Sequence, residues 1–217
     1  MRAWICGASG AWGRAIALRL LRDGYDVVAL GRRDVGELTA WATRLGRGWR
    51  YVPLDLTEVD VAALPREAPD LLFSAAIATA GDRATLVRAN FLGPAAVIEH
   101  AIGLMEAAGA GRVGVLLGQN ARLGLAGLGD VSAGQAALWT WCEAQQADLA
   151  RRGSAVTLTR LIPPRTASST QRLLAARSGH RPRLRRPDAG PLVAAVLAGS
   201  RRGGRRPVGA GLSTLFR

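Results

Sequence analysis

Apolar and polar positions along the first three quarters of the chain predict strands and helices in turn. Short, nearly continuous apolar runs are typical of strands that are buried on both faces. They predict strands at 3–6, 25–30, 49–54, 70–74, 111–117 and 154–161. The apolar spacing between these runs is that of amphipathic helices, and it predicts helices at 15–22, 35–45, 83–108, 131–151 and 189–198.

This alternation predicts an α/β fold: a Rossmann-type, doubly wound parallel sheet with helices on both faces. A length of 217 residues fits a single domain over 1–217. The pattern loosens after Pro163, and residues 164–187 are rich in Arg, Ser and Pro. We therefore expect a mobile segment there, ahead of the last helix.

The chain carries a net charge of +13, and all of its basic residues are arginine. Two explanations are open: a GC-rich coding bias that favours Ala, Gly and Arg together, or an acidic or phosphorylated partner. The charge is densest near the C-terminus, at Arg181, Arg183, Arg185, Arg186, Arg201, Arg202, Arg205 and Arg206. Residues 164–206 contain no aromatic residue, which argues against a nucleic-acid site.

Other features of the composition point to an ordinary intracellular protein. Cys6 and Cys142 lie far apart and match no disulfide framework or metal-ligand spacing. No apolar run approaches the roughly 18 to 20 residues of a membrane span. We therefore expect a cytoplasmic protein that has no metal site and no contact with a membrane.

A glycine loop is the clearest chemical signal. Gly7, Gly10 and Gly13 form a G-x-x-G-x-x-G segment between a predicted strand and a predicted helix. In this setting the first glycine allows a tight turn, the second lets the backbone approach a pyrophosphate, and the third lets strand and helix pack closely. The helix N-terminus then offers free N–H groups to the phosphate. The loop predicts a dinucleotide site.

The end of the second predicted strand bears on which dinucleotide binds. An acidic residue at this place contacts the ribose of NAD, whereas an arginine accommodates the 2′-phosphate of NADP. The sequence has Arg32 and Arg33 there, which favours NADP(H) over NAD(H). The other interpretation is a solvated basic turn.

Several segments together resemble the short-chain dehydrogenase/reductase family over nearly the whole chain. The opening motif spans 6–17, Asp55-Leu56-Thr57 resembles the segment that contacts adenine, and Asn90-Phe91-Leu92-Gly93 resembles the motif whose asparagine belongs to the catalytic tetrad. Leu161 to Pro164 with Thr166 resembles the cofactor segment that follows the sixth strand, and the family carries its substrate lid at about 164–187. The resemblance implies cofactor contacts at Gly7, Ser9, Gly10, Ala11, Trp12, Gly13, Arg32, Arg33, Asp55, Leu56, Ala75, Ala76, Pro163 and Thr166.

The departures from the family pattern concern catalysis. The family's Tyr-x-x-x-Lys pair aligns with Val131 and Gln135, and the chain has no lysine at all. Valine has no proton to give, and glutamine carries no charge that would lower a neighbouring pKa. The resemblance implies a catalytic serine at the end of the preceding strand, where this sequence has Leu117-Gly118-Gln119-Asn120. Asn90, Gln135, Gln119 and Asn120 remain as neutral hydrogen-bonding candidates for the site. Asp130 is expected to cap the helix that follows it.

Two functions remain open. The first is an atypical, NADP(H)-using enzyme that acts on a small organic substrate, which is either free or delivered by an acidic carrier protein. Its reaction is either a reduction without the usual proton relay or a non-redox step of bacterial specialised metabolism. The second is a catalytically inactive homologue that serves as a binding or structural subunit of an active reductase. The resemblance also implies a homo-oligomer, a dimer or tetramer formed through the long helices, with Trp139 and Trp141 at the contact or in the core.

Overall fold

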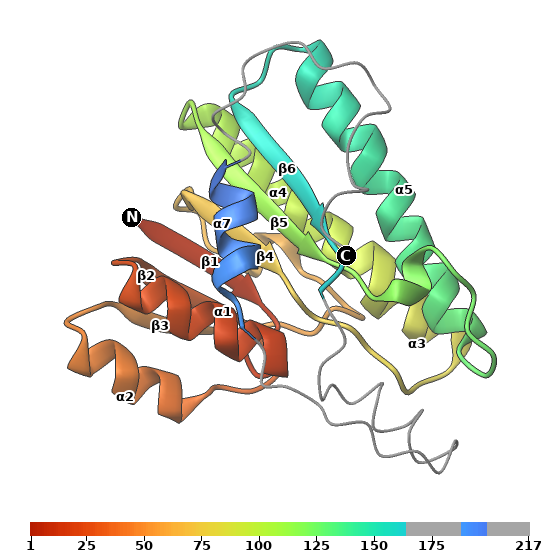
Figure 1. Cartoon of the computed structure of the whole chain (residues 1–217), viewed down its shortest axis with the longest axis horizontal. Coiled ribbons are helices and arrows are strands. Elements are labelled where there is room, and N and C mark those ends of the chain that lie inside the picture. Colours follow the sequence, from red (N-terminus) through yellow and green to blue (C-terminus); the bar gives the residue numbers. More distant parts are fainter. Residues whose placement is uncertain (164–187, 199–217) are drawn as a thin grey trace.

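The computed structural model of the chain describes residues 1–163 and 188–198, and these residues form a six-stranded parallel sheet (Figure 1). The strands lie in the order β3-β2-β1-β4-β5-β6. This is the order of a doubly wound Rossmann sheet, and the predicted fold class is confirmed. The strands are β1 (Arg2–Cys6), β2 (Asp26–Gly31), β3 (Trp49–Pro53), β4 (Leu71–Ser74), β5 (Gly111–Leu116) and β6 (Val156–Leu161).

Helices cover both faces of the sheet and enclose two separate apolar cores (Figure 1). On one face, α1 (Ala11–Arg22), α2 (Gly36–Arg44) and α7 (Gly190–Ala198) pack around Ile5, Leu20 and Phe73. On the other face, α4 (Gly93–Ala107) and α5 (Gly129–Arg151) pack around Trp4 and Leu72. Consecutive strand residues therefore contribute to opposite cores, as the alternation of side chains along a strand requires.

The strand register brings three loops together at the carboxyl edge of the sheet. Cys6 at the end of β1 lies level with Leu30 in β2 and with Ser74 in β4. The N–H of Gly7 donates to the carbonyl of Leu30, and the N–H of Ala75 donates to the carbonyl of Cys6. The chain leaves β1 at the point where the strand order reverses, which is where ligands bind in open α/β sheets.

The helix predicted over 83–108 is wrong as one continuous helix. The structure has α3 (Arg83–Val87), then a π-helical turn at Arg88–Leu92, and then α4. Asn90, which is completely buried, lies in this turn and bonds through its side chain to the backbone of Ala78. The apolar spacing along the helix could not predict this turn, because the turn depends on hydrogen bonds to a loop twelve residues earlier.

The helix after the glycine loop also begins earlier than predicted, at Ala11 rather than at residue 15. Gly13 therefore lies inside the helix, which apolar spacing alone did not indicate. The predicted mobile segment at 164–187, Thr166 and the arginine-rich stretch at 201–206 lie outside the described residues. Within the described ranges, no helix combines the length and the apolar character needed to cross a membrane.

Candidate functional site

The glycine loop folds tightly because its glycines lie against backbone that a side chain would displace. Gly7 has a φ of +88°, and a Cβ placed on it would lie 2.8 Å from the backbone nitrogen of Ala76. A Cβ on Gly13 would lie 2.1 Å from the carbonyl oxygen of Gly7. These contacts show that the first glycine provides the turn and the third provides the close approach of α1 to the loop.

Helix α1 begins directly after this loop, and its first N–H groups are not occupied by a capping side chain of the described residues. Its N-cap is Gly10, and within the described chain no side chain caps the helix and no acidic residue lies in its first turn. The first N–H groups of a helix carry a partial positive charge and bind anions. The loop and helix end therefore form a cradle that fits a phosphate group.

Trp12, in the first turn of α1, is half-buried and packs against the core below the helix. Of the other residues implied in cofactor contact, Ser9, Ala75 and Ala76 are half-buried around the glycine loop, and Pro163 follows β6.

A basic edge borders the loop where β2 ends. Arg32 and Arg33 follow β2 directly and are both exposed. Asp55, after β3, accepts hydrogen bonds on Oδ1 from the N–H and the hydroxyl of Thr57, both 2.9 Å long. These bonds, with the positive charge of Arg32 nearby, hold the pKa of Asp55 below its ordinary value. The next residue, Leu56, is half-buried, and its carbonyl lies against Gly93.

Asn90 uses both ends of its amide for structure. Its Oδ1 accepts from the N–H of Ala78, and its Nδ2 donates to the carbonyl of Ala78, each over 2.9 Å. Gly134 on α5 packs directly against it, because a Cβ on that glycine would lie 2.9 Å from the Cβ of Asn90. Asn90 therefore ties the loop after β4 to the helical layer and has no free polar atom in this state.

The first turns of α5 carry Val131 and Gln135 on the inner side of the helix. Val131 is 2% exposed and Gln135 is fully buried. Gln135 accepts a hydrogen bond on Oε1 from the N–H of Gly118, 2.9 Å long, and its buried Nε2 has no hydrogen-bond partner among the described residues. Neither side chain bears a charge, and Val131 can neither donate nor accept a proton.

The loop after β5 supplies further amides. Asn120 is nearly buried, and its Nδ2 also has no hydrogen-bond partner among the residues described. Gln119, its neighbour in the short 3₁₀ turn Gln119–Ala121, is exposed. Asn120 and Gln135 therefore flank Gly118 with two buried N–H₂ donors, whereas Gln119 does not join them. The sequence predicted both Gln119 and Asn120 as candidates, and it could not show that only Asn120 is buried.

Comparison with known protein families shows to which family the chain belongs. A sequence model described as the NAD dependent epimerase/dehydratase family matches residues 3–113, just over half of the 217 residues. The match covers the glycine loop, Arg32, Asp55 and Asn90. The chain belongs to the NAD dependent epimerase/dehydratase family. No curated protein matched in a separate search.

Solved structures similar to this family member include short-chain dehydrogenases and a reductase. A short chain dehydrogenase/reductase family protein shares 24% identity, covers 92% of this chain and 89% of its own, and has a TM-score of 0.75. A 3-oxoacyl (acyl-carrier-protein) reductase from Agrobacterium tumefaciens C58 with NADP bound shares 22% identity over 91% and 86% of the two chains, with a TM-score of 0.75. A putative short chain dehydrogenase from Escherichia coli CFT073 complexed with NADPH shares 19% over 90% of each, also at 0.75. The resemblance to this fold is confirmed.

The expectation that Asp130 caps α5 in this family member is wrong. The N-cap is Leu128, and Asp130 lies within the first turn. Its carboxylate instead pairs with Arg83 at the start of α3, with 2.9 Å between Nε and Oδ1. The favourable position of a carboxylate near a helix N-terminus is retained, although the hydrogen bond of a cap is not.

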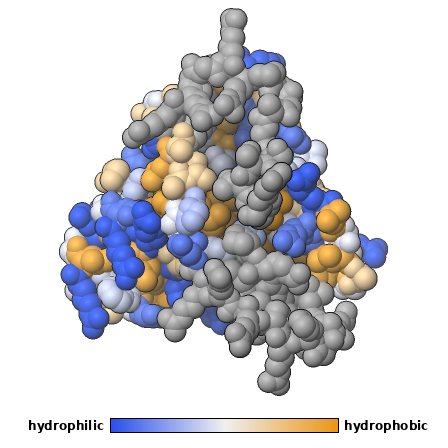
Figure 2. Space-filling view, viewed as in Figure 1, coloured by the Kyte–Doolittle hydropathy of each residue, from blue (hydrophilic) through white to orange (hydrophobic). Residues whose placement is uncertain are grey.

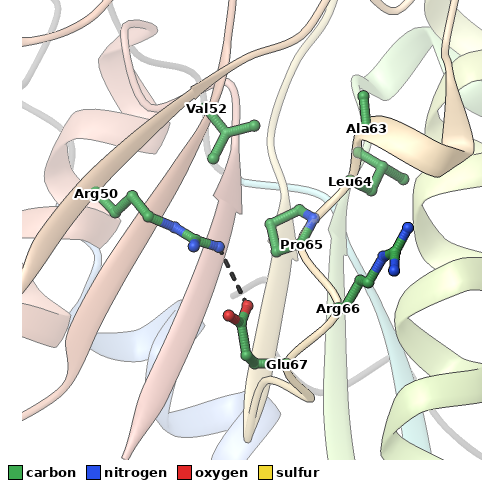
Figure 3. Close-up of a pocket in the computed structure, with 7 residues that line it drawn as sticks. All are labelled: Arg50, Val52, Ala63, Leu64, Pro65, Arg66 and Glu67. Carbon is green, nitrogen blue, oxygen red and sulfur yellow. Dashed lines mark hydrogen bonds and ion pairs between the residues drawn. The ribbon is translucent and has the colours of Figure 1, made fainter.

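A shallow hollow of about 300 Å³ lies away from the glycine loop (Figure 3). It is lined by β3 residues and by the segment 63–67 that precedes β4, so it opens near the amino ends of the strands. Figure 3 shows Glu67 between Arg50 and Arg66, and an ion pair of 3.2 Å joins Glu67 to Arg50. Because a ligand of this fold binds at the carboxyl edge, the hollow is not part of the nucleotide site.

The cysteines offer no reactive thiol. Burial raises the pKa of Cys6 and of Cys142 to about 12 each, so both remain protonated near neutral pH. In residues 1–163 and 188–198, no group of three or more His, Cys, Asp and Glu side chains is placed to hold a metal ion.

Proposed function

We propose that the chain is an NADP(H)-binding protein that acts on a small organic substrate without the Tyr/Lys proton relay of short-chain dehydrogenases. One observation carries the proposal: the phosphate cradle at Gly7–Gly13 is intact, and the inner face of α5 carries Val131 and Gln135. This combination supports a protein that binds the cofactor but lacks the family's proton donor.

The residues of the cradle fit a dinucleotide. The backbone at Gly10 and the N-terminus of α1 would hold the pyrophosphate. Arg32 at the end of β2 would pair with the 2′-phosphate, and Asp55 would lie by the adenine. Two structures of similar fold, the Agrobacterium tumefaciens reductase and the Escherichia coli dehydrogenase, have NADP and NADPH bound, respectively.

The remaining groups of the site bind and orient and do not transfer protons. NADPH would supply a hydride when bound. Gln135 and Asn120 present buried N–H₂ groups that can donate to an oxygen of the ligand, and Asn90 holds the loop after β4 in place. A reaction here therefore needs its proton from the substrate or from water, or is a non-redox step. An acidic carrier protein that delivers the substrate would be attracted by the net charge of +13.

A second function rests on the burial of Val131. A side chain that is 2% exposed fills the place of the tyrosine with packed hydrocarbon, which is also expected of a catalytically inactive subunit. In that case the chain binds an active reductase, and the α5 face with Trp139 and Trp141 is the proposed contact. Activity that requires a partner chain would favour this function.

The direct experiment is a titration of the full chain with NADPH and with NADH, followed by tryptophan fluorescence, since Trp12 lies in the first turn of α1. We expect saturable binding with a preference for NADPH, and Arg32→Gln should weaken NADPH by about tenfold or more while leaving NADH nearly unchanged. Arg44→Gln, an exposed arginine at the end of α2, is the matched control. Failure of both dinucleotides to bind would overturn the proposal.

A further inference from the structure

Strand β6 places an arginine in a row of side chains that is otherwise apolar. Val156 and Leu158 are buried in the core beneath α5. Because side chains alternate along a strand, Arg160 belongs to the same row. Its side chain is only 14% exposed. A guanidinium in such a position must be compensated, since burial of an unpaired charge is strongly unfavourable.

The compensation found in the structure is incomplete. The guanidinium carbon of Arg160 lies 4.3 Å from the centroid of the Trp139 ring. Its Nη2 lies 3.2 Å from a carboxylate oxygen of Glu143, one turn further along α5, and that carboxylate side chain is 62% exposed. Its Nη1 is buried and has no hydrogen-bond partner in the described part of the chain.

A second guanidinium reaches the same ring. Arg122 follows the short turn after β5, and its guanidinium carbon lies 5.7 Å from the centroid of Trp139. Two positive charges thus meet around one indole, with one solvent-exposed carboxylate beside them. The positive charge of Arg160 also acts on Cys142. It lowers the pKa of that thiol, against the larger rise that burial causes.

We propose that Arg160, Arg122 and Trp139 form a binding site for the carboxylate or phosphate group of a small molecule. The planar fork of an arginine matches either anion with two parallel N–H donors, and a cation stacked on an aromatic ring is held ready for it. Glu143 occupies one arm of the fork in the absence of ligand and is displaced when the anion binds. A negatively charged ligand would give the unpaired Nη1 of Arg160 a hydrogen-bond acceptor, and it would also balance the positive charge of Arg122.

The site lies outside the proposed cofactor cradle. Arg122 follows β5 and Arg160 is the fifth residue of β6, so both lie toward the carboxyl edge at the far side of the sheet from β2, where Arg32 is located (Figure 1). The inference therefore goes beyond the proposed function and does not depend on NADP(H) binding. A ligand that reaches this edge can do so with the glycine loop empty or filled.

The same protein contains a natural control. On the opposite face, Trp41 on α2 is flanked by Arg22 at 5.4 Å and Arg44 at 5.7 Å. Both of these arginines are exposed, and hydrophilic side chains gather over this end of the molecule (Figure 2). Neither has a buried guanidinium nitrogen that lacks a partner. Trp41 therefore has two arginines beside its ring, as Trp139 has, but neither of them is a buried and incompletely paired charge.

The test is a calorimetric titration of the full chain with inorganic phosphate and, separately, with acetate, at constant ionic strength maintained with chloride. We expect saturable binding of at least one of the two. Arg160→Gln should weaken it by about tenfold or more, because a charge-assisted pair is lost. Glu143→Gln should strengthen it severalfold, because the competing carboxylate is gone. Arg22→Gln should leave it unchanged.

The outcomes separate the alternatives. Binding of phosphate alone assigns a phosphate ligand, and binding of acetate alone assigns a carboxylate ligand. Because Glu143 is exposed, its variant tests the site even if Arg160→Gln fails to fold. The proposal is overturned if neither anion binds to the wild type or to Glu143→Gln, or if Arg160→Gln and Arg22→Gln bind as the wild type does. NADPH binding in the same Arg160→Gln protein would remain intact, which separates this inference from the cofactor assignment.

Discussion

The amide of Gln135 on α5 accepts a hydrogen bond from the backbone N–H of Gly118, two residues after β5, with 2.9 Å between Oε1 and that nitrogen. The bond fixes which end of the amide faces the strand. The N–H₂ end consequently faces away, buried and without a partner in the described residues. Gln135 therefore carries a neutral donor, unpaired within the described chain, and also holds α5 to the loop after β5.

Removal of this amide should cost stability. Gln135→Leu leaves the N–H of Gly118 without its acceptor, and we expect the free energy of unfolding to fall by about 1 kcal/mol. Gln145→Leu, a half-buried glutamine further along α5, is the control and should change stability by less than about 0.5 kcal/mol. Urea unfolding followed by circular dichroism measures both. Equal effects of the two substitutions would contradict the structural role of Gln135.

The third glycine of the loop should not tolerate a methyl group. Gly13→Ala places a Cβ 2.1 Å from the carbonyl oxygen of Gly7, so the backbone must move, and we expect a loss of about 1–3 kcal/mol together with weaker NADPH binding. Gly36→Ala at the start of α2 meets no atom within 4 Å and should be neutral or stabilising by up to about 1 kcal/mol. Thermal unfolding and dinucleotide titration check the pair. Tight NADPH binding by Gly13→Ala would show that the loop is not the phosphate site.

Asn90 should act through structure. Asn90→Ala removes both hydrogen bonds to Ala78, and we expect it to lower the free energy of unfolding by about 2 kcal/mol or more, because two polar groups of the backbone lose their partners. Asn90→Asp keeps an acceptor for the N–H of Ala78 and loses the donor, and it also buries a charge. Denaturant titration compares the variants with the wild type. Unchanged stability in Asn90→Ala would contradict the tie between this side chain and the loop.

Acid should weaken the pair between Glu106 and Arg152. The hydrogen bond from Arg152 lowers the pKa of Glu106 below its ordinary value in the folded state. A depressed folded pKa means that the pair stabilises the fold fully above the unfolded pKa of Glu106 and that this contribution is lost as pH falls through the folded value. The melting temperature of Glu106→Gln should therefore lie below that of the wild type at pH 7, and the difference should vanish in acid. A difference that persists or grows in acid would contradict this.

The sequence predicted the sheet because a buried parallel strand leaves a local signature. Residues 25–30 and 70–74 were identified from their continuous apolar runs and correspond to β2 and β4 with shifts of one residue. The glycine loop was equally visible, since its spacing between a strand and a helix is itself the signal. In both cases the signal is carried by residues close together in the chain, although the partners that complete the sheet and the loop lie far away, such as Leu71 for Ala3 and Ala76 for Gly7.

The features that were missed depend on partners distant in the sequence. The π-helical turn at Asn90 depends on Ala78, and the position of Asp130 depends on Arg83, 47 residues away. Arg160 gave no signal either, because its stacking on Trp139 joins β6 to α5 across the fold. Periodicity describes one face of one element and cannot show which groups meet across two of them.

NADP(H) binding at the glycine loop is the central proposal for this protein, and amide hydrogen exchange tests its location directly. Exchange in the full chain is measured by mass spectrometry with and without saturating NADPH. We expect protection of peptides that contain 7–14 and 31–35, with little change in peptides from the amino-terminal edge around 63–67. Binding without protection of the glycine loop, or no binding at all, would contradict the cofactor site.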